Sequence, residues 1–541
     1  MTVPVVGPAV PDPSRPGWDD VQALAADVWA WRRVQAPRSR DDIPRQERPA
    51  GWAPDFSAAG VEAARARRAE LHARWAGIDL AGADVATRVD HALVGSTLAR
   101  VRWELDVLRS PERDASFWVD QALGPVFDAL LQPPPFGPER VAQLAHLLAV
   151  VPAQVATAQA QLAGGAEAEL AAVALDMLAD AGTRLRAAVA ALPVPDLDAG
   201  PAADALDALA GWLTAELPRM APFAPVGRAA FEEFLREVTL APESVDWMVT
   251  VAEAEFARAV TMEAVATAAA AGVPVPPLPV DVAAHCADEA AAEAEVRRWY
   301  DEKGLLTVPA WAGRYLFAPR PPWLAPLAGM GVTDDLLGPS RLGQDPVSYA
   351  PDPAPELPFF YRANMLDPRL GVAHEGVHAL QLTWSATHPD PVRREYVDSQ
   401  SNEGIAFYDE EMLLDSGLWS DAPHSRVVVA RFLRLRALRV LLDVGLATGS
   451  MSIDTAARML AERVPVDVET AREEAAFFAG TPGQALTYLV GKVQVQQLLA
   501  DVVAAQGDEF DLRAFHDRLW LEGNVPLAMQ RWELLGTPPE L

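Results

Sequence analysis

The sequence predicts a mostly α-helical protein, and three observations support this fold class. Apolar residues recur at helical spacing near the start of the chain, where Val21, Leu24, Val28 and Trp31 fall at i, i+3, i+7 and i+10. Alanine-rich segments follow as far as about residue 270. Alanine loses almost no side-chain entropy in a helix, so such segments form helices readily. Residues that favour strands gather mainly between residues 304 and 364.

Proline clusters divide the chain into its expected elements. Residues 1–17 are proline-rich and predict a flexible arm. The helical pattern then resumes, and the rigid run 274–279 (Pro-Val-Pro-Pro-Leu-Pro) connects its first part to the rest of the chain. The helices expected from periodicity cover residues 61–75, 89–108, 228–238, 244–271, 427–444, 453–464 and 468–478, with another beginning at the Thr-Pro-Gly of 481–483.

The segment 141–166 carries no charged residue. Pro152, His146 and several glutamines interrupt it, and its apolar positions fall on one stripe. This pattern favours a buried pair of amphipathic helices over a membrane span. The N-terminus also lacks the basic region and uninterrupted apolar stretch of a secretory signal, so we expect a cytoplasmic protein without a membrane partner.

A different composition begins near Gly304. Residues 307–309, 314–317, 347–349 and 359–364 combine strand-forming residues with nearby proline or glycine, which predicts short strands or extended loops. The last of these segments would be well placed to pair with a peptide backbone. A packed connector is an equally good reading of the same residues.

Charge and cysteine content exclude several classes of protein. The net charge is −30, with 75 acidic and 45 basic residues, and such a chain repels nucleic acid unless it carries a basic stripe. The basic clusters at 65–68 and 431–439 lie within helical patterns and are interpreted as solvated helix faces. Cys286 is the only cysteine, so no intrachain disulfide and no cysteine-based zinc site can form. We expect its thiol to be a small core residue.

The chemistry of the chain is predicted by the sequence His374-Glu375-Gly376-Val377-His378. On a helix, two histidines four residues apart leave the same face and can chelate one divalent cation. Glu375 would then lie beside the metal, where a base can take a proton from metal-activated water. The alternative is that both histidines are hydrogen-bonded core residues.

A third metal ligand is available in Glu403, which follows His378 by 25 positions on an expected second helix. The turn at residues 388–391 would fold that helix back onto the first. Two histidines and one glutamate leave a coordination position for water, which is typical of a catalytic site. We therefore expect one Zn²⁺ per chain, although the ligands alone leave iron and manganese open.

Three segments resemble a known family. They are His374 to Gln381, Glu403 to Glu410 (E-G-I-A-F-Y-D-E) and Thr481 to Lys492 (T-P-G-Q-A-L-T-Y-L-V-G-K), and together they resemble the bacterial domain-of-unknown-function family 885. The similarity extends from about Trp52 to the C-terminus. That family looks like a relative of the helical gluzincin zinc carboxypeptidases of the carboxypeptidase Taq type.

The resemblance implies a two-lobed, helical, metallopeptidase-like architecture with a central cleft and a few short strands near the metal. An N-terminal helical lobe at 18–300 would face a catalytic lobe at 301–541. The chain departs from the family where H-E-x-x-P-G-H-H-L-Q becomes a plain H-E-x-x-H, and where Phe477 and Ala447 replace an expected Arg and His. The metal ligands therefore carry over, and the substrate contacts do not.

The predicted function is zinc-dependent cleavage of peptide bonds, of the carboxypeptidase or oligopeptidase type. Glu375 is the expected base, and Tyr488, in the family-like Q-A-L-T-Y motif, is the first candidate for stabilising the oxyanion, with His516 second. Either Tyr488 or His516 could instead be a packed structural residue.

Other residues would support the site. Asp409 or Glu410 would accept the free N–H of a metal-bound imidazole, or else be solvated charges. Arg362, Arg369 and Lys492 are candidate cations for a substrate carboxylate.

Two alternatives remain open at the level of sequence. The protein could be a non-catalytic helical binding or scaffold protein, or a metal-dependent hydrolase of non-peptide amides or esters. The expected partner is a peptide or small amide substrate, nucleic acid is not expected, and a homodimer is compatible with the sequence. Changing Glu375 to Gln separates an enzyme from a scaffold, and profiling peptides against small amides separates the two kinds of hydrolase.

Overall fold

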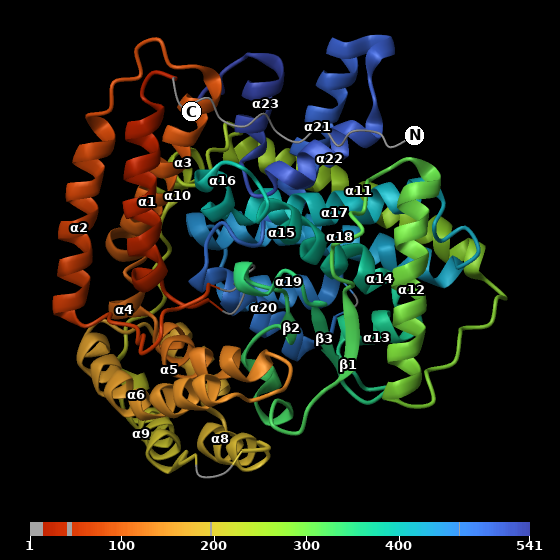
Figure 1. The fold of residues 1–541 in the computed structure, drawn as a ribbon. Helices are drawn as coiled ribbons and strands as arrows, with labels where there is room; N and C mark the ends of the chain where they lie inside the picture. Colours follow the sequence, from red (N-terminus) through yellow and green to blue (C-terminus); the bar gives the residue numbers. More distant parts are fainter. Residues whose placement is uncertain (1–14, 40–45, 195–196, 465) are drawn as a thin grey trace.

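The computed structural model describes residues 15–39, 46–194, 197–464 and 466–541. It confirms a mostly helical protein with a few short strands (Figure 1). The first part of the chain contains only helices in its described residues. These are α1 (Trp18–Gln35), α2 (Ala58–Ala76), α3 (Val85–Arg102), α4 (Ser110–Arg113), α5 (Ala115–Leu131), α6 (Pro138–Leu162), α7 (Ala168–Leu178), α8 (Ala181–Ala190), α9 (Gly200–Glu216), α10 (Arg228–Glu237), α11 (Val245–Ala270) and α12 (Val282–Lys303).

The second part contains a small sheet followed by further helices. The strands are β1 (Leu316–Pro319), β2 (Asp334–Asp335) and β3 (Val347–Ala350). The helices are α13 (Phe359–Leu366), α14 (Arg369–Gly371), α15 (Val377–Ser385), α16 (Pro391–Glu395), α17 (Ser399–Ser416), α18 (Pro423–Thr448), α19 (Ile453–Arg463), α20 (Val468–Gly480), α21 (Thr487–Gln506), α22 (Leu512–Glu522) and α23 (Leu527–Leu535).

The sheet has the strand order β1-β3-β2, with β3 parallel to β1 and antiparallel to β2. Leu316 pairs with Val347, so two of the predicted strand segments do lie side by side. Residues 359–364, in contrast, were expected to be extended and form helix α13 instead. Phe359 and Phe360 of this helix both pack on Phe432 of α18. This tertiary packing outweighs the local strand preference of the aromatic residues.

The charge-free segment forms one helix, α6, where a pair was expected. Pro152 lies inside this helix and removes a backbone hydrogen bond at a typical cost of about 3 kcal/mol. A continuous stripe of buried residues from Leu144 to Leu162 packs against α5 and α9 and offsets this cost. Among the described residues, α6 is the helix long and apolar enough to cross a membrane. A core helix of a helical bundle can be equally long and apolar, and α6 is such a helix because it packs against α5 and α9.

The segment at 481–486 is a turn, and helix α21 begins only at Thr487. Gly483 has a positive φ of 93°, which a helix does not allow. Its N–H and that of Leu486 are accepted by the two oxygens of Asp443, at 2.9 and 3.0 Å. The buried carboxylate therefore holds the turn in place and delays the start of the helix that was expected at residues 481–483.

Four hydrophobic clusters form the core, and each contains residues from both sides of residue 300. The longest helices, α11 and α18, pack along each other, and α17 packs along α21. The lobe boundary at residue 300 and the central cleft stay predictions. Most of the predicted arm, residues 1–14, lies outside the described residues, while Arg15 pairs with Asp84 at 3.1 Å.

The lone cysteine is half-buried on α12 against the main core cluster, as expected for a structural residue. Burial raises the pKa of the Cys286 thiol to about 11. A thiolate is therefore disfavoured at neutral pH, which argues against a nucleophilic role.

Glu289 is a buried carboxyl group beside the sheet. Its Oε2 accepts the N–H of Phe317 at 2.7 Å, and its Oε1 is buried without a hydrogen-bond partner. Burial raises the pKa of Glu289 to about 8. The group therefore keeps its proton in the folded protein at pH values where it is ionised in the unfolded chain, near and above about 4.3.

Replacing Glu289 by Gln is expected to stabilise the protein more at pH 8 than at pH 5. The wild-type protein loses stability as the pH rises from about 4.3 to about 8, because only its folded state holds the proton over that range. Glutamine has no such proton, so its advantage grows to the order of 1–3 kcal/mol. Chemical denaturation at the two pH values measures the difference, with the exposed Glu302→Gln on the same helix as the control. An advantage of equal size at both pH values would contradict the assignment.

Candidate metal centre

The first two predicted ligands lie on one continuous helical segment. Residues Val372–Gly376 form a π-helical turn, and α15 continues from Val377. A π-helical turn contains more residues than an α-helical turn, and such turns are frequent at functional sites. His374 lies in the widened turn and His378 one turn later, so that their ring centroids are 4.9 Å apart at an angle of 87°.

The structure brings the three predicted ligands together. Glu403 Oε2 lies 3.4 Å from His374 Nε2 and 3.2 Å from His378 Nε2. All three side chains are buried, and their ligand atoms lie within 4.8 Å of one another. Two imidazoles and one carboxylate on a common point are a donor set that suits Zn²⁺ with an open position.

Glu410, on the same helix as Glu403, fixes the orientation of His374. Its Oε1 lies 2.8 Å from His374 Nδ1, so this carboxylate is close enough to hold the ring on that side while Nε2 faces Glu403. Of the two acidic residues predicted for this role, Glu410 takes it, whereas Asp409 accepts the hydroxyl of Tyr300 at 2.7 Å. The imidazole is therefore oriented for metal binding before any ligand arrives.

The electrostatics of the site favour positive charge. Burial alone would lower the pKa of His374, but the Glu403 and Glu410 carboxylates outweigh it and raise this pKa to about 9. Burial alone would raise the pKa of Glu403, but His378 and His374 together hold it below its ordinary range. The cluster thus attracts a cation to its centre.

Several buried atoms at the site have no hydrogen-bond partner among the described residues. His378 Nδ1 and Glu375 Oε2 are two of them, and His374 Nδ1 and both oxygens of Glu410 are others. A closed structural cluster would satisfy such groups, since an unsatisfied buried polar atom costs about 1–3 kcal/mol. The unpartnered Glu375 oxygen therefore fits a site that is completed by a bound molecule better than a self-contained set of core residues.

The helix that carries Glu403, α17, packs closely against α21. A Cβ atom built on Gly491 would lie 2.1 Å from the carbonyl oxygen of Gln400 and 2.7 Å from the Cα of Gly404. Only glycine fits at either position without moving a backbone. The contact places α21 directly against the turn that carries Glu403.

Tyr488, on the first turn of α21, lies at the site. Its half-buried ring stacks on that of His374, with centroids 6.0 Å apart and an angle of 14°. The guanidinium groups of Arg436 and Arg439 lie 5.6 and 5.1 Å from the Tyr488 ring. The structure therefore brings this candidate beside a metal ligand, while its role toward an oxyanion stays a prediction.

His516 is not brought to the three ligands. Its Nδ1 lies 2.7 Å from the Leu305 carbonyl oxygen, which can only accept, so Nδ1 carries the proton. Its Nε2 lies 2.9 Å from the Tyr408 hydroxyl. Burial lowers the pKa of His516 to about 4. Both ring nitrogens of His516 contact other groups of the protein. This arrangement favours the alternative that His516 is a packed structural residue.

Most of the cationic side chains that were candidates for binding a substrate carboxylate form ion pairs within the protein. Lys492 is fully buried between Glu255 and Glu411, with both contacts at 2.7 Å. Arg369 forms ion pairs with Asp367 at 2.9 Å and with a further acidic neighbour at 3.1 Å. Arg362 is exposed on α13. Two of the three candidates therefore stabilise the fold.

The sequence interpretation missed the buried arginines of α18. Arg436 and Arg439 were placed on a solvated face, yet they are 3% and 7% exposed. Arg436 lies 3.1 Å from Glu410, and Arg439 pairs with Glu474. Their position at i and i+3 on an otherwise apolar face was the signal that both point inward.

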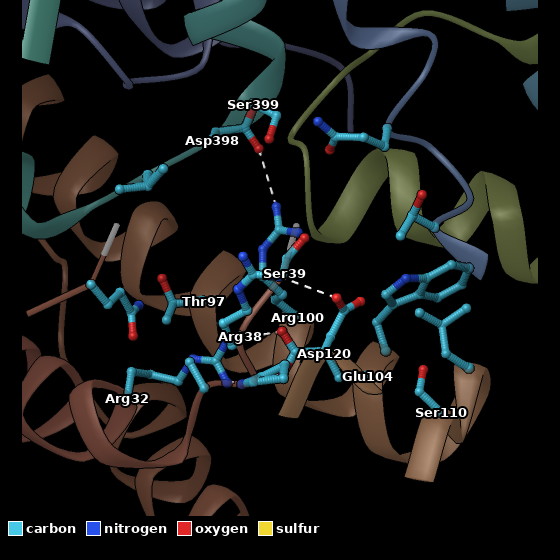
Figure 2. Close-up of a pocket in the computed structure, with 18 of the residues that line it drawn as sticks. Arg32, Arg38, Ser39, Thr97, Arg100, Glu104, Ser110, Asp120, Asp398 and Ser399 are labelled. Carbon is cyan, nitrogen blue, oxygen red and sulfur yellow. Dashed lines mark hydrogen bonds and ion pairs between the residues drawn. The ribbon is translucent and has the colours of Figure 1, made fainter. Parts of the chain in front are cut away.

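A cavity of about 1030 Å³ lies at the start of α17. Figure 2 shows some of the residues that line it, among them Arg100, Asp398 and Ser399. Its walls come from α1, α3 and the start of α5 on one side, and from residues 394–400 and 476–487 on the other. Gln400, one turn before Glu403, and Thr487, next to Tyr488, both line it. The three candidate ligands are not among its lining residues, and Gln400 and Thr487 are the points at which the lining comes close to the site along the chain.

Comparison with solved structures supports the fold over the whole chain. One similar structure is titled "The crystal structure of the putative lipoprotein from Colwellia psychrerythraea", with a TM-score of 0.71 and 16% sequence identity. Another is "The structure of a putative lipoprotein of unknown function from Shewanella oneidensis", with a TM-score of 0.66 and 16% identity. Each comparison covers 96% of this chain and 98% of the other. At this identity the likeness shows the fold alone.

Comparison by sequence identifies the C-terminal part. No curated protein matches the chain at a significant level. Residues 357–534 match the family described as "Bacterial protein of unknown function (DUF885)". The match includes all three motifs on which the resemblance was based, although it begins well after Trp52. Residues 357–534 are therefore similar to the bacterial family that those motifs predict.

Proposed function

We propose that this protein is a metal-dependent hydrolase that cleaves peptide bonds, with the metal held by His374, His378 and Glu403. The observation that carries the proposal is the convergence of these three ligand atoms within 4.8 Å, together with the unpartnered carboxylate oxygen of Glu375, the residue that follows His374 in the chain. A divalent cation bound there would act as a Lewis acid, polarising a carbonyl group and making water more acidic. Zn²⁺ suits the donor set best.

Other residues of the chain would transfer the proton and position the metal ligands. Glu375 follows His374 directly, and its Oε2 is buried without a hydrogen-bond partner, so it can accept a proton from the attacking water and return it to the leaving amine. Glu410 holds the His374 ring, and Tyr488 forms the wall against which that ring stacks. The likeness to carboxypeptidases of the Taq type remains part of this proposal and rests on the motifs.

The proposal is tested by incubating the purified protein with a mixture of peptides and following new fragments by mass spectrometry. Fragments that vanish after chelation and return with added Zn²⁺ support it. Small blocked amides and esters in the same assay identify the alternative hydrolase. A protein that carries its full complement of metal and leaves all three substrate classes intact would refute the enzyme and favour a scaffold.

The location of the protein requires a separate proposal. The titles of the two similar structures read "putative lipoprotein", and lipoproteins are held at a membrane by attached lipid. We infer from this likeness a location at a membrane surface or outside the cytoplasm, in place of the cytoplasm expected from the sequence. Fractionation of the source cells decides between the two.

A further inference from the structure

The cavity at the start of α17 has the size of a ligand site. At about 1030 Å³ it lies at the upper end of the range for small-molecule pockets, about 300–1,000 Å³, so it has room for several peptide residues. Aromatic side chains from both sides line it, among them Trp29, Trp103 and Tyr396. Such a mixture of aromatic and polar walls is typical of sites that bind peptides.

One end of the cavity comes close to the metal ligands along the chain. Gln400 and Glu403 are three residues apart on α17, and side chains at this spacing are neighbours on a helix. Thr487 precedes Tyr488, whose ring stacks on His374. A chain bound in the cavity with its end near these two residues would therefore reach the metal centre.

Gln400 offers an unused acceptor to such a chain. Its side chain is 3% exposed, and its Nε2 donates to Gln494 Oε1 at 2.7 Å. Its Oε1 is buried without a hydrogen-bond partner. Because this oxygen is buried, the N–H of a peptide backbone can satisfy it only after the amide turns toward the cavity, which would remove the cost of leaving it unpaired.

Arg100 offers unused donors at a greater distance from the metal. It extends from α3, and its Nη2 lies 3.3 Å from Asp398 Oδ2 at the start of α17 (Figure 2). The Arg100 side chain is 32% exposed. Among the described residues, its polar contact is the one with Asp398. By contrast, Arg32 in the same wall is held by Glu104 through two bonds of 2.9 and 2.8 Å. The remaining N–H groups of Arg100 can therefore bind a carboxylate.

The two anchor points are separated by a measurable length of chain. Asp398 precedes Glu403 by five residues, which is about 7.5 Å along a helix axis. An extended residue spans about 3.3–3.6 Å, so a single residue is too short to bridge this distance and about two come close to it.

We propose that the cavity binds the C-terminal part of an oligopeptide, with its carboxylate on Arg100 and the cleaved bond at least two residues before that end. The assignment rests on the proposed peptide hydrolysis and makes it more specific. The released fragments are dipeptides or longer peptides, and single amino acids are not released. Gln400 holds the peptide backbone between the two points.

Binding is tested with two pools of N-acetylated hexapeptides of the same randomised sequence, one ending in a free carboxylate and one in an amide. Each pool is equilibrated with metal-loaded Glu375→Gln protein, and bound peptide is measured by ultrafiltration and mass spectrometry. We expect the acid pool to bind at least about tenfold more tightly, as a charge-assisted contact implies. Arg100→Gln in the same background should remove the preference.

Two further variants separate this role from a structural one. Arg102 lies on the same helix but pairs with Glu233 and Glu237 outside the cavity, so Arg102→Gln should keep the full preference. Arg100→Lys keeps the charge and should keep part of it. Equal binding of the two pools by the parent protein, or an equal loss for both pools in Arg100→Gln, would overturn the assignment.

Products of the wild-type protein give an independent readout. Cleavage of the acid pool should yield C-terminal fragments of two or more residues, and release of single amino acids would overturn the register. If the acid preference is present but nothing is cleaved, hydrolysis fails and the cavity assignment stands. If cleavage occurs without any preference for the acid pool, hydrolysis stands and the cavity assignment fails.

Discussion

Changing Glu375 to Gln is expected to lower peptide turnover by at least about 10²–10⁴-fold while leaving the metal in place. Glu375 follows His374 in the chain and does not belong to the three residues that converge. Its Oε2 is buried without a hydrogen-bond partner, so no other residue competes for it as a base. Glutamine has the same shape but accepts no proton, and thus the loss should fall on kcat.

The measurement combines initial rates with the metal content of the same sample. The exposed Glu302→Gln serves as the matched control and should keep full activity. A Glu375→Gln protein that retains metal and more than about a tenth of wild-type turnover would show that another group accepts the proton. A variant that loses its metal would instead place Glu375 among the ligands.

Changing Gly491 to Ala is expected to have the largest effect on stability. The new methyl group would lie 2.1 Å from the carbonyl oxygen of Gln400, so α17 and α21 must separate. Backbone atoms cannot move aside as a flexible side chain does, and a cost of about 3 kcal/mol or more follows. The separation also moves Glu403 away from the histidines, and we expect metal affinity to fall together with stability.

Gly211 provides the matched control for this change. It is exposed on α9, and a Cβ atom built there meets nothing within 4 Å. Gly211→Ala should therefore stabilise the helix by about 0.5–1 kcal/mol, because it restricts only the unfolded chain. Denaturation midpoints of the two variants should shift in opposite directions. Similar shifts for both would mean that the contact between α17 and α21 is less tight than the structure shows.

The sequence was most informative where a site depends on local spacing. His374 and His378 share a helix, so their meeting followed from the helical period alone. Glu403 was found through its motif, and the close approach of its helix to Gly491 gave no local signal. The helical fold class was predictable for the same reason, since periodicity and alanine content act over single segments.

The sequence was least informative where distant segments meet. Arg100 and Asp398 are 298 residues apart, and no periodic pattern connects them. The strand preference of Phe359 and Phe360 gave way to their packing on Phe432 of α18, so a helix formed where an extended segment was expected. The burial of Arg436 depends in the same way on a cluster of aromatic side chains supplied by other helices.

The most direct test of the metal centre is the zinc content of the purified protein after equilibration with Zn²⁺ and removal of the excess. We predict about one zinc per wild-type chain, because a single group of three ligands was found among the described residues. His378→Ala should fold and lose that zinc. A wild-type protein that binds none, or a His378→Ala protein that retains a full equivalent, would contradict the assignment of this site.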